Sequence, residues 1–160
     1  MTHDFEDAAT LADRVGVLVD GELRQLASPA KLVAEPADAF VAALAGGNLL
    51  HGLAHPLPGG LTQIDLDEGG SCYTIDAREG RVTALVYPWD VSLSRTQPDD
   101  SALNHVQGEI VSLTPIGNRV RVRVGPLTAE VTSASAQRLG LAPGEHVVAT
   151  FKASATRVVG

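Results

Sequence analysis

Three hydroxyl residues stand where a short helix is expected to begin, near the C-terminal end of the chain. They are Thr132, Ser133 and Ser135, and a Ser or Thr at a helix start accepts hydrogen bonds from the first free amides. Those amides and the helix dipole also favour an anion. Lys152, one predicted strand later, adds a positive charge. The pattern therefore predicts a small β-domain that can hold a compact oxyanion.

The elements that would position these residues are mainly strands. From Asn48 onward, short apolar stretches alternate with Gly-rich turns, a spacing typical of a β-sandwich or barrel. No internal repeat is evident. We expect one helix at 133–139 and strands at about 49–57, 61–66, 71–76, 81–87, 91–94, 104–116, 118–124, 127–131, 146–152 and 156–159.

The first 46 residues differ from the rest of the chain in the spacing of their apolar residues. A helical period runs from Asp4 to Arg14, and Asp20-Gly21 is a hairpin signal after the apolar run Val15–Val19. Ser28-Pro29 and Glu35-Pro36 each open a further short helix. A continuous apolar strand is usually buried on both faces. We therefore expect both faces of Val15–Val19 to require apolar neighbours, of which this chain offers few. We also expect this region to present an apolar surface that another domain or copy covers, and to be loosely packed without it.

Charge and composition exclude several classes of protein. The 160 residues carry a net charge of −7, so a role in binding nucleic acid is not expected, because phosphate affinity comes mainly from Lys and Arg. The alternating run 119–124 (Arg-Val-Arg-Val-Arg-Val) is predicted to be the solvated face of a strand. Cys72 is the only cysteine, and the histidines lack metal-ligand spacing, so no disulfide and no metal site is expected.

No segment resembles a membrane span or a signal peptide. No run approaches the roughly 18 apolar residues that a spanning helix needs, and the N-terminus is acidic. We therefore expect a cytoplasmic protein without direct insertion into a membrane.

Residues 101–160 resemble a TOBE domain of the molybdate-binding (Mop) type. The matching residues are Ser101-Ala102-Leu103-Asn104, Gly108, Thr132 through Gly144 and Phe151-Lys152-Ala153-Ser154. The resemblance implies an OB-like β-barrel that binds molybdate or tungstate. It implies that Ser101, Thr132, Ser135, Lys152 and Ser154 hold the oxyanion, with Ser101 often contributed by a neighbouring subunit. Leu103 stands where Mop domains commonly carry Arg, which removes a guanidinium that would bind the anion in bidentate fashion.

Residues 1–47 resemble the end of the ATPase domain of ATP-binding-cassette (ABC) proteins. Thr2–Ala8 is similar to the switch-histidine loop, in which His3 matches the histidine that contacts the γ-phosphate of ATP. Tyr87–Ser94 is similar to the segment that precedes the TOBE half of importer ATPases. We therefore expect three parts: an ATPase-domain remnant at 1–47, a first β-segment at 48–100 and a TOBE/Mop domain at 101–160.

The fold class that follows is mainly β, an OB-like TOBE/Mop barrel with a short N-terminal α/β remnant of an ABC ATPase domain. The chain contains no G-x-x-x-x-G-K-[ST] phosphate loop. No catalytic residue is therefore expected, and we expect that this chain alone does not hydrolyse ATP. ATP and Mg²⁺ would belong to the full-length parent.

The resemblance implies the regulatory and dimerisation region of the ATP-binding subunit of a bacterial ABC importer for molybdate or a related oxyanion. The subunit would form a homodimer, contact membrane permease subunits through the parent ATPase and lie at the inner face of the membrane. Two alternatives stay open: a stand-alone Mop-type oxyanion-binding protein, and a purely structural dimerisation module whose hydroxyls only cap a helix.

Overall fold

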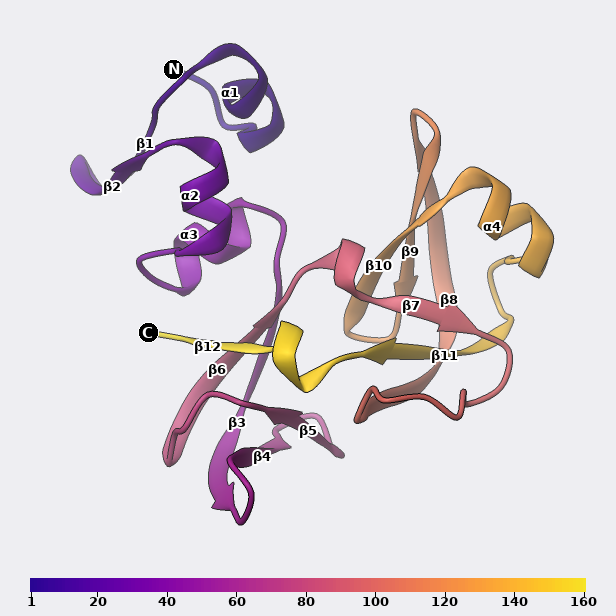
Figure 1. Ribbon diagram of the computed structural model, residues 1–160. Helices are drawn as coiled ribbons and strands as arrows, with labels where there is room; N and C mark the ends of the chain where they lie inside the picture. Colours follow the sequence, from indigo (N-terminus) through magenta and orange to yellow (C-terminus); the bar gives the residue numbers. More distant parts are fainter.

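Two five-stranded antiparallel sheets carry most of the chain (Figure 1). The computed structural model describes all residues, 1–160, and the predicted mainly β class is confirmed. The first sheet has the order β12-β6-β3-β4-β5, with β3 (Asn48–Leu57), β4 (Leu61–Leu66), β5 (Ser71–Thr74), β6 (Gly80–Val86) and β12 (Arg157–Val159). The second has the order β10-β9-β8-β11-β7, with β7 (Ser92–Ser94), β8 (Asn104–Ile116), β9 (Arg119–Val124), β10 (Leu127–Thr132) and β11 (His146–Phe151).

The two sheets are one motif used twice. The strands β3, β4, β5, β6 and β12 of the first sheet correspond to β8, β9, β10, β11 and β7 of the second. With this correspondence, the first strand order equals the second read from its other end. A short 3₁₀ turn follows the fourth strand of each repeat: η1 (Pro88–Asp90) and η2 (Ala153–Ala155). The expectation of no internal repeat is therefore wrong. The repeat lies in the topology, and the sequence marks it only by an Asn that opens β3 and β8 and a Gly four residues later.

The last strand of each repeat crosses to the other sheet. β7 pairs with β11 through Leu93 and Ala149, and β12 pairs with β6 through Val158 and Ala84. The expected domain boundary at residue 100/101 stays a prediction, and each sheet contains one strand from the far side of it.

One apolar core serves both sheets. It includes Ile64 of β4, Ala84 of β6, Val122 of β9 and Phe151 of β11, each at most 1% exposed. Because burial of apolar surface is the main driving force of folding, this shared core joins the repeats into one unit. No helix in the structure is long and apolar enough to cross a membrane.

One asparagine of each sheet forms two hydrogen bonds with an edge strand of the other sheet, and we call each of these contacts a brace. The side chain of Asn48 both donates to the Thr128 carbonyl and accepts from the Thr128 amide, each at 2.8 Å. Asn104 does the same with Tyr73, at 3.0 and 2.7 Å. Thr128 lies on β10 and Tyr73 on β5, both edge strands, so each brace satisfies backbone groups that no neighbouring strand pairs.

The N-terminal segment is α/β, as predicted. It contains α1 (Phe5–Leu11), the hairpin β1 (Val15–Val19) and β2 (Glu22–Ala27), α2 (Pro29–Ala34) and α3 (Ala39–Leu44). Asp4, Ser28 and Asp38 cap the three helices by accepting amide hydrogen bonds. The hairpin turn holds Asp20 and Gly21 at φ of 51° and 80°, which suits the Asp-Gly pair.

Strand β1 is covered on one face only, in agreement with the expectation that this region presents an apolar surface. Val17 is 2% exposed and packs with Leu32 and Val41 of the helices, whereas Leu18 on the opposite face is 56% exposed. The cause is that α2 and α3 lie on the same side of this two-stranded sheet. The end of this region also packs on the β-repeats, because Ala42 and Ala45 form one buried cluster with Leu85 and Tyr87.

Candidate functional site

Thr132 and Ser135 form a capped helix start, as their types and spacing predict. The Thr132 hydroxyl accepts from the Ser135 amide at 3.1 Å and donates to the Ser135 hydroxyl at 2.9 Å, at the start of α4 (Ser133–Leu139). The Ser133 amide donates to the Asn118 carbonyl at 2.9 Å. Two of the amides that could bind an anion are therefore already paired within the chain, and the Ser135 hydroxyl keeps its own proton to donate.

The other three predicted residues form a second group. The first residue of β8 pairs with the last of β11, Asn104 with Phe151, and this brings the segment that contains Ser101 beside the turn that contains Lys152 and Ser154. All three side chains are exposed. The turn is closed by the Thr156 hydroxyl, which donates to the Lys152 carbonyl at 3.0 Å and leaves the Lys152 ammonium group in solvent.

The two groups lie at opposite ends of β8 (Figure 1). Ser101 precedes its start, while Thr132 pairs with Arg119 on β9, which in turn pairs with Ile116 at the end of β8. β8 has 13 residues, so its ends are on the order of 40 Å apart along an extended strand. A single chain therefore does not bring the five predicted residues together.

The first repeat does not supply a second copy of the site. Lys152 is the residue before η2, and Tyr87 takes the equivalent place before η1. Trp89 follows where the second repeat has Ser154, and its ring stacks on Tyr87 with centroids 4.6 Å apart. Aromatic rings replace the cation and the hydroxyl, so only the second repeat has the residues predicted to hold an oxyanion.

His3 lies in the exposed N-terminal segment just before α1. The next residue, Asp4, caps α1 by accepting from the amides of Glu6 and Asp7. The structure thus places His3 at the start of a capped helix and far along the chain from the other predicted residues.

Comparison with known proteins identifies part of the chain. Residues 100–158 match the TOBE domain family. Residues 100–158 form a TOBE domain. The molybdate/tungstate import ATP-binding protein WtpC of Pyrococcus abyssi is 34% identical over 164 residues, which cover 99% of this chain and 46% of that protein. The sulfate/thiosulfate import ATP-binding protein CysA of Nitrosomonas europaea is 30% identical, covering 92% of this chain and 41% of that protein.

The chain thus matches the TOBE-containing part of ABC importer ATP-binding proteins and spans about half the length of these curated relatives. Among solved structures, the cytoplasmic molybdate-binding protein ModG has a similar fold, with a TM-score of 0.64 and 23% identity. The match covers 70% of this chain and 94% of that chain. This likeness confirms the Mop-type, OB-like fold of the two repeats.

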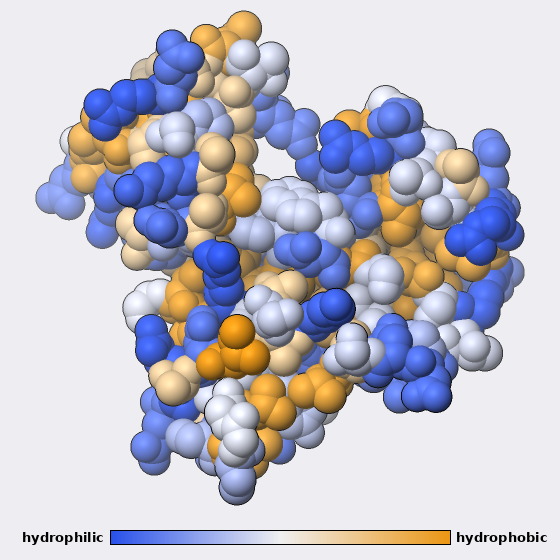
Figure 2. All heavy atoms as spheres, in the orientation of Figure 1, coloured by the Kyte–Doolittle hydropathy of each residue, from blue (hydrophilic) through white to orange (hydrophobic).

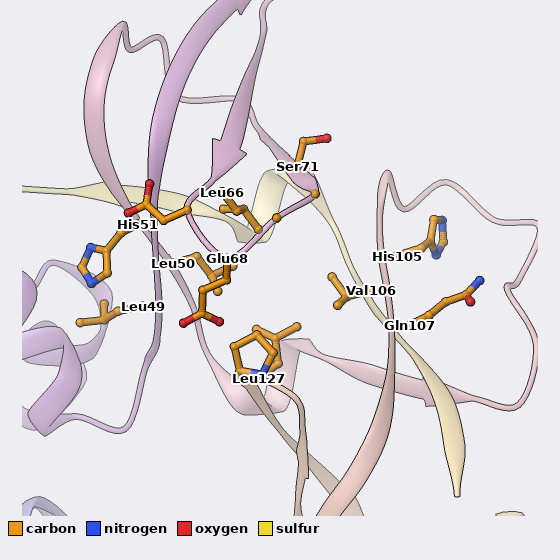
Figure 3. Close-up of a pocket in the computed structure, with 14 residues that line it drawn as sticks. Leu49, Leu50, His51, Leu66, Glu68, Ser71, His105, Val106, Gln107 and Leu127 are labelled. Carbon is orange, nitrogen blue, oxygen red and sulfur yellow. The ribbon is translucent and has the colours of Figure 1, made fainter.

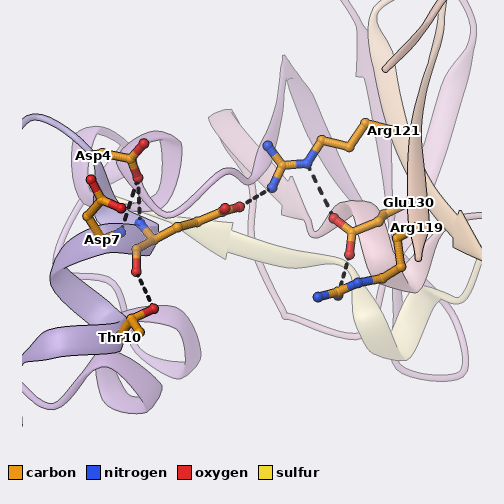
Figure 4. A network of polar contacts seen from close by, with 7 residues as sticks. Asp4, Asp7, Thr10, Arg119, Arg121 and Glu130 are labelled. Carbon is orange, nitrogen blue, oxygen red and sulfur yellow. Dashed lines mark hydrogen bonds and ion pairs between the residues drawn. The ribbon is translucent and has the colours of Figure 1, made fainter. Parts of the chain in front are cut away.

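An ion-pair network on the TOBE domain was not predicted from the sequence (Figure 4). Glu130 of β10 is only 7% exposed and binds two arginines of β9: Arg119 at 2.5 Å and Arg121 at 3.3 Å. Arg121 also contacts Glu6 of α1. The alternating burial of β9 confirms that its arginines lie on the solvated face. The sequence did not identify Glu130, because no residue near it in the chain indicates that its carboxylate pairs with two arginines.

Arg121 stays charged within this network. Burial by itself lowers its pKa, whereas the hydrogen bonds from Arg121 to Glu130 and Glu6 raise it, and the balance is a raised pKa. The contact of this charged guanidinium with Glu6 therefore joins the N-terminal segment to the TOBE domain by an ion pair.

A pocket between the two repeats was also not predicted (Figure 3). Its volume is about 490 Å³, and it lies between β3, the β4–β5 turn, the start of β8 and the β9–β10 turn. Figure 3 shows the Glu68 carboxylate between Leu49 and Leu127. No Lys or Arg lines the pocket, and Asp67 at its edge has a lowered pKa because Arg81 donates to it. Two carboxylates, Asp67 and Glu68, and the absence of a lining Lys or Arg make this pocket a poor place for an oxyanion.

Proposed function

We propose that this chain is the regulatory and dimerisation region of the ATP-binding subunit of an ABC importer for molybdate, tungstate or a related oxyanion. The observation that carries the proposal is the 34% identity with a molybdate/tungstate import ATP-binding protein over 99% of the chain. The TOBE domain at 100–158 and the hydroxyl and lysine side chains of the second repeat support it.

The oxyanion would bind between two copies of the chain. Thr132 and Ser135 lie at one end of β8, and Ser101, Lys152 and Ser154 lie at the other. A homodimer that brings one end of each copy against the opposite end of its partner would unite them. Hydroxyl groups would then donate to the anion and Lys152 would balance its charge, which are the strong contacts available to a tetrahedral dianion.

Regulation would follow from where the anion binds. An anion held between two subunits favours the arrangement in which both halves of the site meet, and so shifts the population between dimer arrangements. ATP and Mg²⁺ would be bound by the remainder of the parent ATPase, where His3 would act, and this chain by itself would not hydrolyse ATP. Permease subunits at the inner face of the membrane would be contacted through that parent.

Calorimetric titration with molybdate, tungstate and sulfate tests the oxyanion site. We expect heat for at least one anion. We expect Lys152→Gln to weaken binding about tenfold or more, because a hydrogen bond to a charged group contributes about 1.5–3 kcal/mol. Lys31→Gln is the matched control, since Lys31 is exposed on α2 and pairs only with Glu35. Equal affinity in both variants, or no heat with any anion, would refute the site.

Two other functions each have one observation in their favour. The likeness to ModG, which covers 94% of that chain, favours a stand-alone oxyanion-binding protein. The bond between the Thr132 and Ser135 hydroxyls favours a structural dimerisation module in which they only cap α4. Absence of heat supports the module, whereas molybdate binding without any effect on the ATPase activity of a parent transporter supports the stand-alone protein.

A further inference from the structure

Glu130 lies between the helix start at Thr132 and the N-terminal segment. On β10 it is two residues from Thr132, and both side chains lie on the outer face of the strand. On β9 its two partners are Arg119, which pairs in register with Thr132, and Arg121, which pairs in register with Glu130 itself. The nearly buried carboxylate therefore takes two guanidinium groups from the same strand.

Arg121 divides its guanidinium between two acids of different parts of the chain. Its Nε contacts Glu130 and its terminal nitrogen contacts Glu6 of α1 (Figure 4). α1 contains no buried residue, and Phe5 alone packs partly against the neighbouring apolar clusters. The contact with Arg121 is consequently a substantial part of what holds α1 on the TOBE domain.

We propose that Glu130 couples the oxyanion site to helix α1 by redistributing these two arginines. The inference rests on the function proposed above and names the regulation of that site. Paired residues of antiparallel strands are about 4.5–5.5 Å apart between Cα atoms, so a dianion at Thr132 lies within reach of the Arg119 guanidinium and competes for it with Glu130.

When Arg119 turns to the anion, Glu130 keeps Arg121 as its only partner and attracts it more strongly. Arg121 then leaves Glu6, and α1 loses its ionic contact with β9. Asp4 caps α1 directly after His3, so release of the helix also releases the segment that carries His3. The anion and the Glu6 contact thus compete for one set of charges, and coupling of this kind is reciprocal.

Reciprocity gives a test with a matched pair of variants. Glu6→Gln removes the contact with Arg121, so the anion no longer has to break it, and we expect molybdate affinity to rise about threefold, within the range of an exposed ion pair. Asp7→Asn removes the same charge from the neighbouring residue of α1, whose carboxylate makes no ion pair, and we expect affinity to change less than about 1.5-fold.

Hydrogen exchange of the α1 amides supplies the second measurement. The Ala8 and Ala12 amides donate to Asp4 and Ala8 within this helix, and we expect them to exchange faster when molybdate is bound and in Glu6→Gln without ligand. Equal affinities in the two variants, or α1 exchange that molybdate does not change, would overturn the coupling while leaving the site intact. Absence of heat with the unsubstituted protein would refute the proposed function, and the coupling with it.

Discussion

At the scale of single residues, the two asparagine braces are the clearest link between sequence and fold. Asn48 and Asn104 are 8% and 2% exposed, and each satisfies both backbone groups of one residue on an edge strand. The amide nitrogen donates while the amide oxygen accepts, so one side chain satisfies both groups. A residue that opens a strand in one sheet therefore protects the edge of the other.

Replacing Asn104 should strongly destabilise the protein. Asn104→Ala leaves the Tyr73 amide and carbonyl without these hydrogen bonds, and each buried unsatisfied group costs about 1–3 kcal/mol. We expect the free energy of unfolding to fall by about 2–5 kcal/mol in urea titrations. Asn118→Ala in the exposed β8–β9 turn is the control and should change it by less than about 0.5 kcal/mol.

The buried thiol of Cys72 gives a pH dependence. Burial raises its pKa from 9.0 to about 11. Because the folded pKa lies above the unfolded one, the contribution to stability is complete below pH 9 and is lost as pH rises to about 11. We expect unsubstituted protein to lose about 2–3 kcal/mol more than Cys72→Ala over that interval in chemical denaturation. Parallel pH profiles of the two proteins would contradict this assignment.

At the scale of elements, the β1–β2 hairpin combines a covered and an open face. Leu18, Leu23 and Leu26 are 56%, 56% and 47% exposed, and Figure 2 shows apolar side chains at the surface of this N-terminal segment. The opposite face packs against Leu32 of α2. The continuous apolar run in β1 therefore reflects two apolar faces, of which this chain buries one.

Substitutions on the two faces should behave differently. Leu32→Ala removes a fully buried side chain and should cost about 2–5 kcal/mol, whereas Leu23→Ala should cost less than about 0.5 kcal/mol. Amide exchange of β1 measures both, because it follows the stability of this segment directly. Similar losses for the two variants would mean that the outer face is covered in solution.

At the scale of the whole molecule, the two repeats are interlocked. β7 and β12 each pair with the other repeat's strand, the apolar core is shared, and the braces cross in both directions. Neither repeat has its full sheet without the other. The residues proposed to bind an oxyanion occur once per chain, because Tyr87 and Trp89 take the places of Lys152 and Ser154 in the first repeat.

Interlocking predicts one cooperative unfolding transition for residues 48–160. Calorimetry should show a single peak, and amides of β4 and β9 should exchange with similar free energies. Deleting residues 157–160 removes β12 and should lower the stability of both sheets together. Two separate transitions, or a loss confined to the first sheet, would contradict this.

The sequence by itself determined the local structure. Helix starts at Ser28 and Thr132, the Asp20-Gly21 turn and nearly every strand were predictable, because caps, turns and apolar alternation act between residues close in the chain. The helix expected to open at Glu35-Pro36 begins three residues later, where the Asp38 side chain caps α3. The residues of the candidate site were predicted from a family resemblance, and their capping chemistry from their types.

Only the tertiary structure decided how these elements combine. The strand exchange, the brace between Asn48 and Thr128 and the contact between Glu6 and Arg121 join residues up to 115 positions apart. The separation of Thr132 from Lys152 along β8 is equally a matter of strand register. Pairing over such distances depends on which surfaces the whole fold brings together, and no local pattern of residue types contains that information.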